Sequence, residues 1–539
     1  MDLAELLTPS LEAMLKDIKP PSAYPGPDEL DTILDAWRSQ GAAVQLLGHS
    51  RQGSPIQAAV IGTGPKTFLG WGYPHPEEPI GAQGLVELGT AALQGKLSDL
   101  SDWRLVLVLC ADPDNARRQL WLRGDRTLMD FAAGSWRPTH LGLEVDYGFP
   151  IDHGPFYQPV DFAGRCRSLD DCPFDCASLA ECRRAKLPFP PLPESIALQA
   201  AMKLFRPQLV AAMHSTHTSG DYTFLLRREK DEVLKDLTEL PKAVGSMRHL
   251  GEPVDRGVRW KREAPDLIRE RTYDYHRRRL ERHQNYRADY AYAGNASAAV
   301  IVETMLPGSQ FVCPETGLFR HPDFADTDLC QTKLSFRIAA EDRRRGRYLM
   351  TRYKRGDEWV VASQSRLEDG KRIKSRETQA AVTRAALGVD ALLTRRASLA
   401  QADLIWERVK TLPDLTWHPY LEERRRTSVP GAYVGDQAML IFRAREDYAR
   451  VATISQAATF NWLWPIHTIS LLANFRNFLV AQDQERPEIG AAVKQLTDIQ
   501  AEQAKLLPVE LQTEAPREIA IRSQLARVFR LMLAQAERR

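Results

Sequence analysis

A histidine and a glutamate stand three positions apart in the stretch "GYPHPEEPIG", which contains His75 and Glu78. Imidazole nitrogens and carboxylate oxygens both bind zinc, and a catalytic zinc site needs three such protein ligands and one open position. An acidic helix start, stabilised by the helix dipole, is the alternative explanation for the same pattern. A metal site here therefore requires a third ligand from another part of the chain.

The segment "LVAAMHSTHTSGDY" offers that third ligand. Its apolar run is typical of a buried strand and ends at His214, and His217 follows three residues later. A histidine that leaves a core strand directly can reach a site beyond the strand end. We therefore expect His214 to be the ligand, with His217 as the alternative.

The elements around these residues predict an α/β fold. Between residues 55 and 305, short β-branched runs alternate with helical patterns, as in an α/β sheet. The predicted strands are "IQAAVIG", "TFLGWG", "RLVLVLCA", "QLVAAMHS" and "AAVIVETM", and helices are expected at residues 80–94 and 193–205. Open α/β sheets place their ligand crevice at the carboxyl ends of the strands. The polar residues at or just beyond these ends are His75, Asp112, His214 and Glu303.

The order of the segments resembles the carboxypeptidase A-type zinc carboxypeptidase family. The matching stretches are "GHSRQGSPIQAAVIG", "GWGYPHPEEPIGAQGLVEL", "DWRLVLVLCADPDNARRQLWL", "LPESIALQAAMKLFRPQLVAAMHS" and "AAVIVETM", which fall within about residues 45–310. The resemblance implies a mixed central sheet flanked by helices, a zinc ion held by His75, Glu78 and His214, and Glu303 as general base. A zinc-bound water has a pKa of about 7, and a nearby carboxylate can take its proton as the water attacks a carbonyl.

The stretch that would recognise the substrate's end departs from the family pattern. The family holds a terminal carboxylate with an Asn-Arg pair, whereas the corresponding stretch here reads "LEVDYGFPID", with Asp146 and Tyr147 in that place. Arg137, in "SWRPTH", is a substitute cation that is near in sequence. Recognition of a C-terminal carboxylate therefore stays open.

Two further roles follow from the resemblance alone. An arginine after the central turn polarises the scissile carbonyl and stabilises the developing oxyanion. Arg123 is the positional candidate in "DPDNARRQLWLRGDR", and Arg118 lies close to it. A tyrosine before the base strand closes over the substrate in this family, and Tyr292 is the candidate here.

Composition excludes several classes of protein. With 43% hydrophobic and 26% charged residues, the chain is typical of a soluble globular protein, and its net charge of +2 indicates neither nucleic acid nor membrane as a partner. The first 20 residues lack the basic lead and apolar core of a signal peptide. We therefore expect a cytoplasmic protein. The resemblance to zinc carboxypeptidases implies a peptide or small amide substrate.

Four of the seven cysteines fall in one short segment, with five, three and five residues between successive members. Neither spacing is that of a standard zinc finger. A second, structural zinc, unligated thiols and disulfides all stay open, and in each case the cluster acts as a staple. The members are Cys166, Cys172, Cys176 and Cys182.

The sequence changes in character after about residue 335, where an arginine-rich stretch leads into long helical patterns. We expect a catalytic domain at residues 1–335, with a cysteine-containing insertion near 160–185, and a mostly helical C-terminal domain at 336–539 that could bind a protein partner. The function predicted first is a zinc carboxypeptidase. A zinc amidohydrolase or deacylase on the same scaffold and a non-catalytic binding protein are the alternatives.

Overall fold

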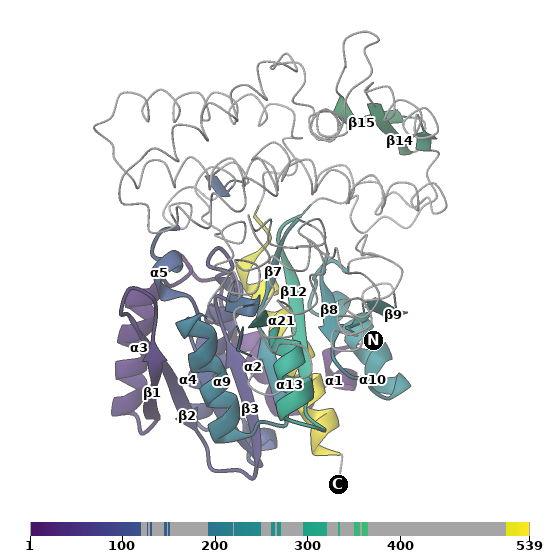
Figure 1. The fold of residues 1–539 in the computed structure, drawn as a ribbon. Coiled ribbons are helices and arrows are strands. Elements are labelled where there is room, and N and C mark those ends of the chain that lie inside the picture. Colours follow the sequence, from purple (N-terminus) through teal and green to yellow (C-terminus); the bar gives the residue numbers. More distant parts are fainter. Residues whose placement is uncertain are drawn as a thin grey trace, which may run out of the picture.

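A mixed β-sheet with helices on both faces makes up most of the chain that the computed structural model describes (Figure 1). The described residues are 2–119, 127, 130–131, 145–147, 149–150, 192–218, 220–248, 260–264, 267–270, 295–320, 332–334, 350–355, 358–364 and 514–537. The α/β class and the mixed central sheet expected from the sequence are confirmed.

Ten strands of the described chain belong to the main sheet. Nine lie in the spatial order β1 (Ala43–His49), β2 (Pro55–Ile61), β4 (Trp103–Val108), β3 (Lys66–Trp71), β6 (Leu209–Ala212), β12 (Gln310–Phe319), β8 (Tyr222–Leu225), β10 (Leu267–Glu270) and β9 (Trp260–Ala264), and β7 (Ser215–Thr218) pairs with β12. The central strands β4, β3, β6 and β12 are parallel to one another. Antiparallel pairs flank them, with β2 beside β4 and β8 beside β12.

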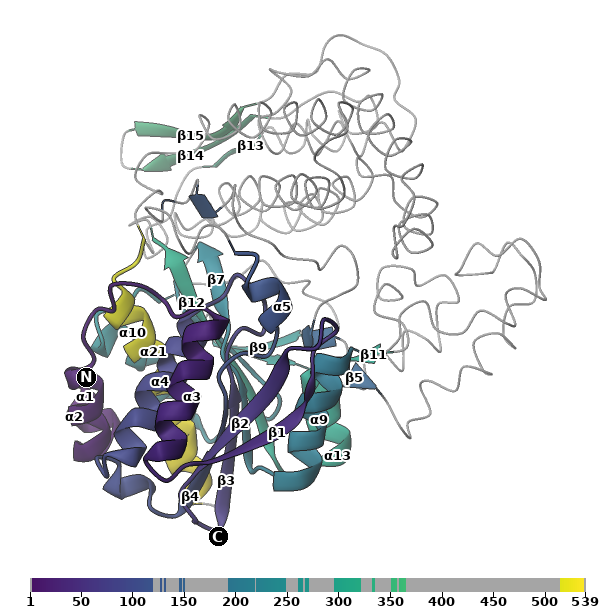
Figure 2. The same cartoon turned by 90° about the vertical axis from the view of Figure 1, so that its left-hand side faces the viewer.

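Helices cover the two faces of the sheet unequally (Figure 2). One face carries α1 (Leu3–Leu6), α2 (Pro9–Asp17), α3 (Pro27–Ser39), α4 (Ile80–Leu93), α10 (Asp231–Ala243) and α21 (Arg517–Ala536). The other carries α9 (Pro193–Phe205) and α13 (Ala298–Met305). Among the described helices, none combines the length and the apolar character needed to cross a membrane.

The remaining described elements are short. The helical turns are η1 (Ser98–Leu100), α5 (Pro113–Ala116) and η4 (Val145–Tyr147). A two-stranded sheet pairs β5 (Phe149–Pro150) with β11 (Asn295–Ala296), and a three-stranded sheet contains β13 (Thr332–Leu334), β14 (Met350–Arg355) and β15 (Glu358–Gln364).

Strand β4 shows how the sheet separates two hydrophobic cores. Leu105 and Leu107 point into the core beneath α4 and α21, while Val106 and Val108 point into the core beneath α9. Alternate residues of a strand face opposite sides of the sheet, and a strand covered on both faces becomes an almost continuous apolar run. The sequence "RLVLVL" is such a run.

The expected helices at residues 80–94 and 193–205 are present as α4 and α9. Pro193 occupies the first turn of α9, where its missing N–H costs no helical hydrogen bond. Arg206 ends the helix in the left-handed region, with φ 46°. The chain then enters β6, the strand that leads to His214.

The segment "AAVIVETM", expected to be a strand, is instead the helix α13, and that prediction is wrong. Periodicity cannot separate a short apolar run in a strand from one in a buried helix. Ala298, Ala299, Ile301 and Val302 are buried at helical spacing and pack into the core shared with α9. The strand beside β6 is β12, whose ten residues are all buried.

The final helix also corrects the expected domain boundary. α21 lies on the main sheet, packs against α4, α10 and β12, and contributes Ile521, Leu525 and Phe529 to the larger core. Residues 517–536 therefore belong with the N-terminal part of the chain and not with a separate C-terminal domain. Residues 336–513 lie largely outside the described part, so their helical character and domain status remain predictions.

The start of α4 packs so closely against β6 that residue 81 must be glycine. A Cβ on Gly81 would lie 2.3 Å from both Cβ and O of Met213, whereas one on Gly84 would lie 3.6 Å from the nearest atoms of Leu525. We predict that Gly81→Ala lowers the unfolding free energy by about 1–3 kcal/mol through overpacking. The matched variant Gly84→Ala should be neutral or gain up to about 1 kcal/mol from helix propensity. Urea unfolding compares them, and equal effects would contradict this packing argument.

Candidate metal centre

Two loops that leave the sheet at the same edge carry the three predicted metal ligands. His75 and Glu78 lie between β3 and α4, and His214 lies between β6 and β7. β3 and β6 are parallel neighbours whose last pair joins Trp71 to Ala212. Both loops therefore start at the carboxyl ends of adjacent strands, where α/β sheets bind their ligands.

The first of these loops is held in a constrained shape. Tyr73 has φ 50°, in the left-handed region that residues with a side chain rarely adopt. Its ring is fully buried, and its hydroxyl donates to the carbonyl oxygen of Pro25 at 2.7 Å. The amide of Glu78 donates to the carbonyl of His75 at 3.1 Å, which closes a turn around the two ligands.

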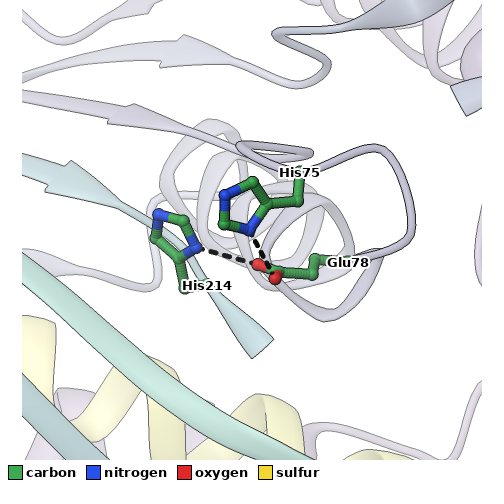
Figure 3. A group of neighbouring side chains, drawn as sticks. All are labelled: His75, Glu78 and His214. Carbon is green, nitrogen blue, oxygen red and sulfur yellow. Dashed lines mark hydrogen bonds and ion pairs between the residues drawn. The ribbon is translucent and has the colours of Figure 1, made fainter. Parts of the chain in front are cut away.

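The carboxylate of Glu78 lies between the two imidazole rings (Figure 3). Its Oε1 is 2.6 Å from Nδ1 of His75, and its Oε2 is 2.9 Å from Nδ1 of His214. Oε2 also accepts a hydrogen bond from the amide of Ser215 at 2.9 Å. All three side chains are buried, and their candidate ligand atoms lie within 4.8 Å of one another.

The donor set fits zinc. Two imidazole nitrogens and one carboxylate form the three-ligand set of several catalytic zinc sites, which leaves the fourth position open. Atoms bound to one tetrahedral zinc at about 2.0–2.2 Å lie roughly 3.4 Å apart. The Nδ1 to carboxylate distances of 2.6 and 2.9 Å therefore need to open by less than about 1 Å.

The electrostatics of the cluster favour a bound cation. Burial opposes the ionised form of Glu78, but the charges and hydrogen bonds of His75 and His214 hold its pKa well below the usual value. Burial likewise opposes charge on His214, while Cys313, Asp146 and Glu78 raise its pKa well above the usual value. Buried acidic groups around two imidazoles need positive charge between them, as protons or as a metal ion.

Asp146 lies behind the histidines, on the side away from Glu78. Its Oδ2 is 2.5 Å from Nε2 of His214 and 3.9 Å from Nε2 of His75. A carboxylate that accepts from the second ring nitrogen fixes the tautomer and orientation of a ligating histidine. The resemblance aligned this stretch with a substrate-binding pair, but Asp146 is placed to orient a metal ligand. Nearby Phe149 is fully buried.

A second carboxylate approaches His214 from β12. Oε1 of Glu315 lies 4.0 Å from Nδ1 of His214, and Sγ of Cys313 lies 3.7 Å from the same carboxylate oxygen. His214, Cys313 and Glu315 form a second group whose candidate ligand atoms lie within 4.8 Å of one another. Because strand residues alternate, Cys313 and Glu315 both point from β12 toward the metal centre.

Glu315 was missed in the sequence, where Glu303 was the expected base. The resemblance implied Glu303 as the base at the end of a predicted strand, but that segment is the helix α13, so the expected strand-end position does not exist. In "QFVCPETGLF", Pro314 and Gly317 argue against a strand, which hid β12. The sequence did contain one signal for Glu315. It is the charged residue of a largely apolar segment that directly follows the turn residues Pro307, Gly308 and Ser309.

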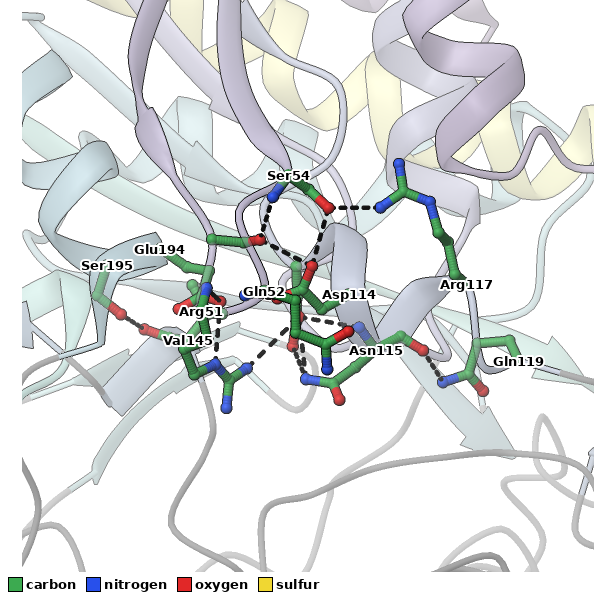
Figure 4. Close-up of polar contacts among 12 residues, drawn as sticks. Arg51, Gln52, Ser54, Asp114, Asn115, Arg117, Gln119, Val145, Glu194 and Ser195 are labelled. Carbon is green, nitrogen blue, oxygen red and sulfur yellow. Dashed lines mark hydrogen bonds and ion pairs between the residues drawn. The ribbon is translucent and has the colours of Figure 1, made fainter. Parts of the chain in front are cut away.

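A polar network fixes the loops on the β2 and α9 side of the same edge (Figure 4). Arg51 Nε donates to Glu194 at 3.0 Å, and its Nη2 lies 3.6 Å from Asp112. Asp114 accepts from Ser50 Oγ at 2.7 Å, and the side-chain Nδ2 of Asn115 donates to Oδ2 of Asp112 at 2.7 Å. These contacts tie the β1–β2 turn to α5 and to the start of α9.

The other expected site residues are only partly accounted for. Arg118 lies half-buried directly after α5, where its amide donates to the carbonyl of Asn115 at 3.0 Å. The backbone of His217 belongs to β7. Outside the described residues lie Arg123, Arg137, Tyr292, Cys166, Cys172, Cys176 and Cys182. The substrate-binding and structural-metal roles of these residues therefore stay predictions.

The network makes stability depend on pH through Asp112. Burial raises the pKa of Asp112 to about 6, Arg51 opposes that rise and Glu194 adds to it. The pKa of Asp112 in the folded protein lies above its value in the unfolded chain. The protonated Asp112 side chain therefore contributes to stability below about pH 4, and this contribution is lost as pH rises through about 6. The variant Asp112→Asn should not lose stability in this way, because the asparagine side chain does not ionise. Relative to the variant, the wild type should lose up to about 3 kcal/mol of unfolding free energy between pH 4 and pH 7. Parallel pH profiles would contradict this assignment.

No family model matches the sequence, and no curated protein matches it. Solved structures do. A metallo-carboxypeptidase from Burkholderia cenocepacia matches at 15% identity over 54% of this chain and 60% of that one, with a TM-score of 0.28. The carboxypeptidase A from Helicoverpa armigera matches at 14% identity over 59% of this chain and 70% of that one, with a TM-score of 0.33. Bovine thrombin-activatable fibrinolysis inhibitor in complex with tick carboxypeptidase inhibitor matches at 12% identity, with a TM-score of 0.29, over 54% of this chain and 86% of that one.

The resemblance to metallocarboxypeptidases that the sequence motifs indicated is thus also found among solved structures, over somewhat more than half of the chain. The match spans three fifths of the Burkholderia cenocepacia protein. At these identities and TM-scores the likeness carries no argument about activity. What the chain does must be argued from His75, Glu78, His214 and their surroundings.

Proposed function

We propose that this chain is a zinc-dependent hydrolase that cleaves a peptide or peptide-like amide bond. One observation carries the proposal, namely that His75, Glu78 and His214 converge from two loops on one buried point with Glu315 beside them. The three side chains would hold zinc through Nδ1 of each histidine and one carboxylate oxygen of Glu78. When bound, the metal acidifies a water and polarises the scissile carbonyl.

Glu315 is the general base in this proposal, in place of Glu303. Its carboxylate lies 4.0 Å from Nδ1 of His214, so a water beside the ligands is within its reach. Glu315 takes a proton from that water as the water oxygen attacks the carbonyl carbon and a C–O bond forms. It then gives the proton to the amine as the C–N bond breaks, so the products are a carboxylic acid and an amine. Asp146 holds the imidazole of His214 in the tautomer that binds metal through Nδ1.

A specific observation supports an amidohydrolase or deacylase as the second candidate. The resemblance implies an Asn-Arg pair at the place of Asp146 and Tyr147, and Asp146 instead lies 2.5 Å from Nε2 of His214. Neither residue carries the positive charge that binds a carboxylate. A carboxypeptidase therefore needs its cation from elsewhere, such as Arg137, whereas an amidohydrolase that ignores the terminal carboxylate needs none.

The surroundings of the enzyme are proposed from sequence alone. We propose a cytoplasmic location, a substrate that is a peptide or small amide, and a protein partner for the C-terminal region. A second zinc at Cys166, Cys172, Cys176 and Cys182 is proposed on the same basis. A non-catalytic binding protein is the remaining alternative, and the metal experiment below distinguishes it.

We predict that the purified full-length protein hydrolyses amides only with zinc bound at these ligands. Glu78→Ala should lose about one equivalent of zinc relative to wild type and all activity, while His49→Ala, at an exposed histidine outside the site, should lose neither. The substrates are acylated dipeptides with free or amidated C-termini and N-acyl amino acids. Preference for the free carboxylate supports a carboxypeptidase, and indifference supports the amidohydrolase. Zinc content that does not depend on Glu78 would contradict both.

The identity of the base can be tested with two matched carboxylates. Glu315→Gln should lower kcat by about 10²–10⁴-fold and keep its zinc, because the variant removes proton transfer but no ligand. Glu303→Gln should stay close to wild type. Steady-state kinetics and zinc analysis on both variants make the comparison. A large loss of kcat in Glu303→Gln with little change in Glu315→Gln would show that Glu303, not Glu315, is the base.

A further inference from the structure

The pairing between strands is interrupted where the site residues lie. β12 pairs with β6 from Gln310 to Val312, and pairing resumes with β7 at Thr316. The residues between the two paired stretches are Ala212, Met213 and His214 on one side and Cys313, Pro314 and Glu315 on the other. Pro314 has no N–H to donate. Carbonyl groups buried at such a break need donors from elsewhere.

Gln524 of α21 supplies donors at this break. Its Nε2 donates to the carbonyl oxygen of His214 and to that of Pro314, the latter at 3.1 Å. The side chain is fully buried. A single amide group therefore bridges the backbone of His214, the candidate metal ligand, and that of Pro314, the residue before the proposed base.

Arg527 lies three residues further along the helix and is 1% exposed. Its Nη1 donates to the carbonyl of Tyr222 at 2.5 Å and to Thr223 Oγ1 at 2.9 Å. Its Nη2 donates to the carbonyl of Glu315 at 3.0 Å and to Thr316 Oγ1 at 2.6 Å. With Nε bonded to the carbonyl of Ser523 at 3.1 Å, all five guanidinium donors are used.

A third contact from the same helix completes the attachment. Ser523 Oγ donates to Oδ2 of Asp221 at 2.5 Å, and Oδ1 of Asp221 accepts from the amide of Gly317 at 3.3 Å. Asp221 is fully buried. Polar groups of α21 therefore hold β8, β12 and the end of β6 together around the site.

We propose that Gln524 and Arg527 are positioning residues of the metal centre, which rests on the function proposed above. Gln524 fixes the backbone of His214 and so sets metal affinity. Arg527 fixes the backbone of Glu315 and so sets the rate of proton transfer. Residues 320–516 separate β12 from α21, so the site is complete only once α21 has docked.

The test separates positioning from general support by the helix. Gln524→Met keeps the length of the side chain but removes both donors, and Arg530→Met, which breaks the 2.7 Å contact with Asp236 on α10, is the matched control. Both variants should lower the melting temperature. Only Gln524→Met should weaken zinc binding, by about 10–100-fold in competition with a chelator.

Arg527→Lys keeps the charge and loses the forked geometry. It should lower kcat by tenfold or more with zinc affinity near wild type, whereas Arg530→Lys should change neither. If Gln524→Met does not fold, the comparison of Arg527→Lys with Arg530→Lys still tests whether α21 positions the site. Equal zinc affinities and kcat values across the site variants and their controls would overturn it. Weaker zinc binding in Gln524→Met without hydrolysis of any amide would instead support positioning and contradict the proposed function.

Discussion

The burial of Glu78 between two imidazoles is the interaction on which the rest of the site depends. A carboxylate removed from water is costly unless positive charge and hydrogen bonds compensate it. Here both oxygens contact histidine nitrogens, and one also accepts from a backbone amide. That arrangement requires two loops from adjacent strands to meet within a few ångströms. The close packing of α4 on β6, the constrained Tyr73 and the orienting Asp146 all serve this meeting.

The fold brings these groups together from distant parts of the chain. The candidate metal ligands come from residues 75–214, the proposed base from β12, and the side chains that bond to both backbones from α21. The parallel centre of the sheet gives one edge where strand ends converge. The pairing of β12 with β6 and β7 is interrupted between Val312 and Thr316, and α21 donates hydrogen bonds to the carbonyl groups of Pro314 and Glu315 there.

Sequence reasoning was strongest where local signals and residue chemistry agreed. The strands that precede His75 and His214 are continuous apolar runs, and α4 and α9 begin with proline at or before their first residue, so their type and place could be predicted. The sequence predicted that His75, Glu78 and His214 meet, because each is a residue type that binds zinc and each lies just beyond the end of a predicted strand. The structure brings these three side chains together as expected.

Glu315 and α21 could not be found in the same way. β12 contains Pro314 and Gly317, which local rules count against a strand, while "AAVIVETM" fits a strand as well as a buried helix. Tertiary packing decided both cases. α21 follows β12 only after almost two hundred residues, and nothing local in its sequence says that Gln524 and Arg527 meet the backbone of distant strands.

The most direct test of the central claim is anomalous X-ray diffraction from crystals of the zinc-loaded protein, measured on both sides of the zinc absorption edge. The account predicts a zinc peak about 2.0–2.2 Å from Nδ1 of His75, a carboxylate oxygen of Glu78 and Nδ1 of His214. A separate peak at the clustered cysteines would leave that claim intact. Zinc-loaded crystals with no peak among His75, Glu78 and His214 would contradict it.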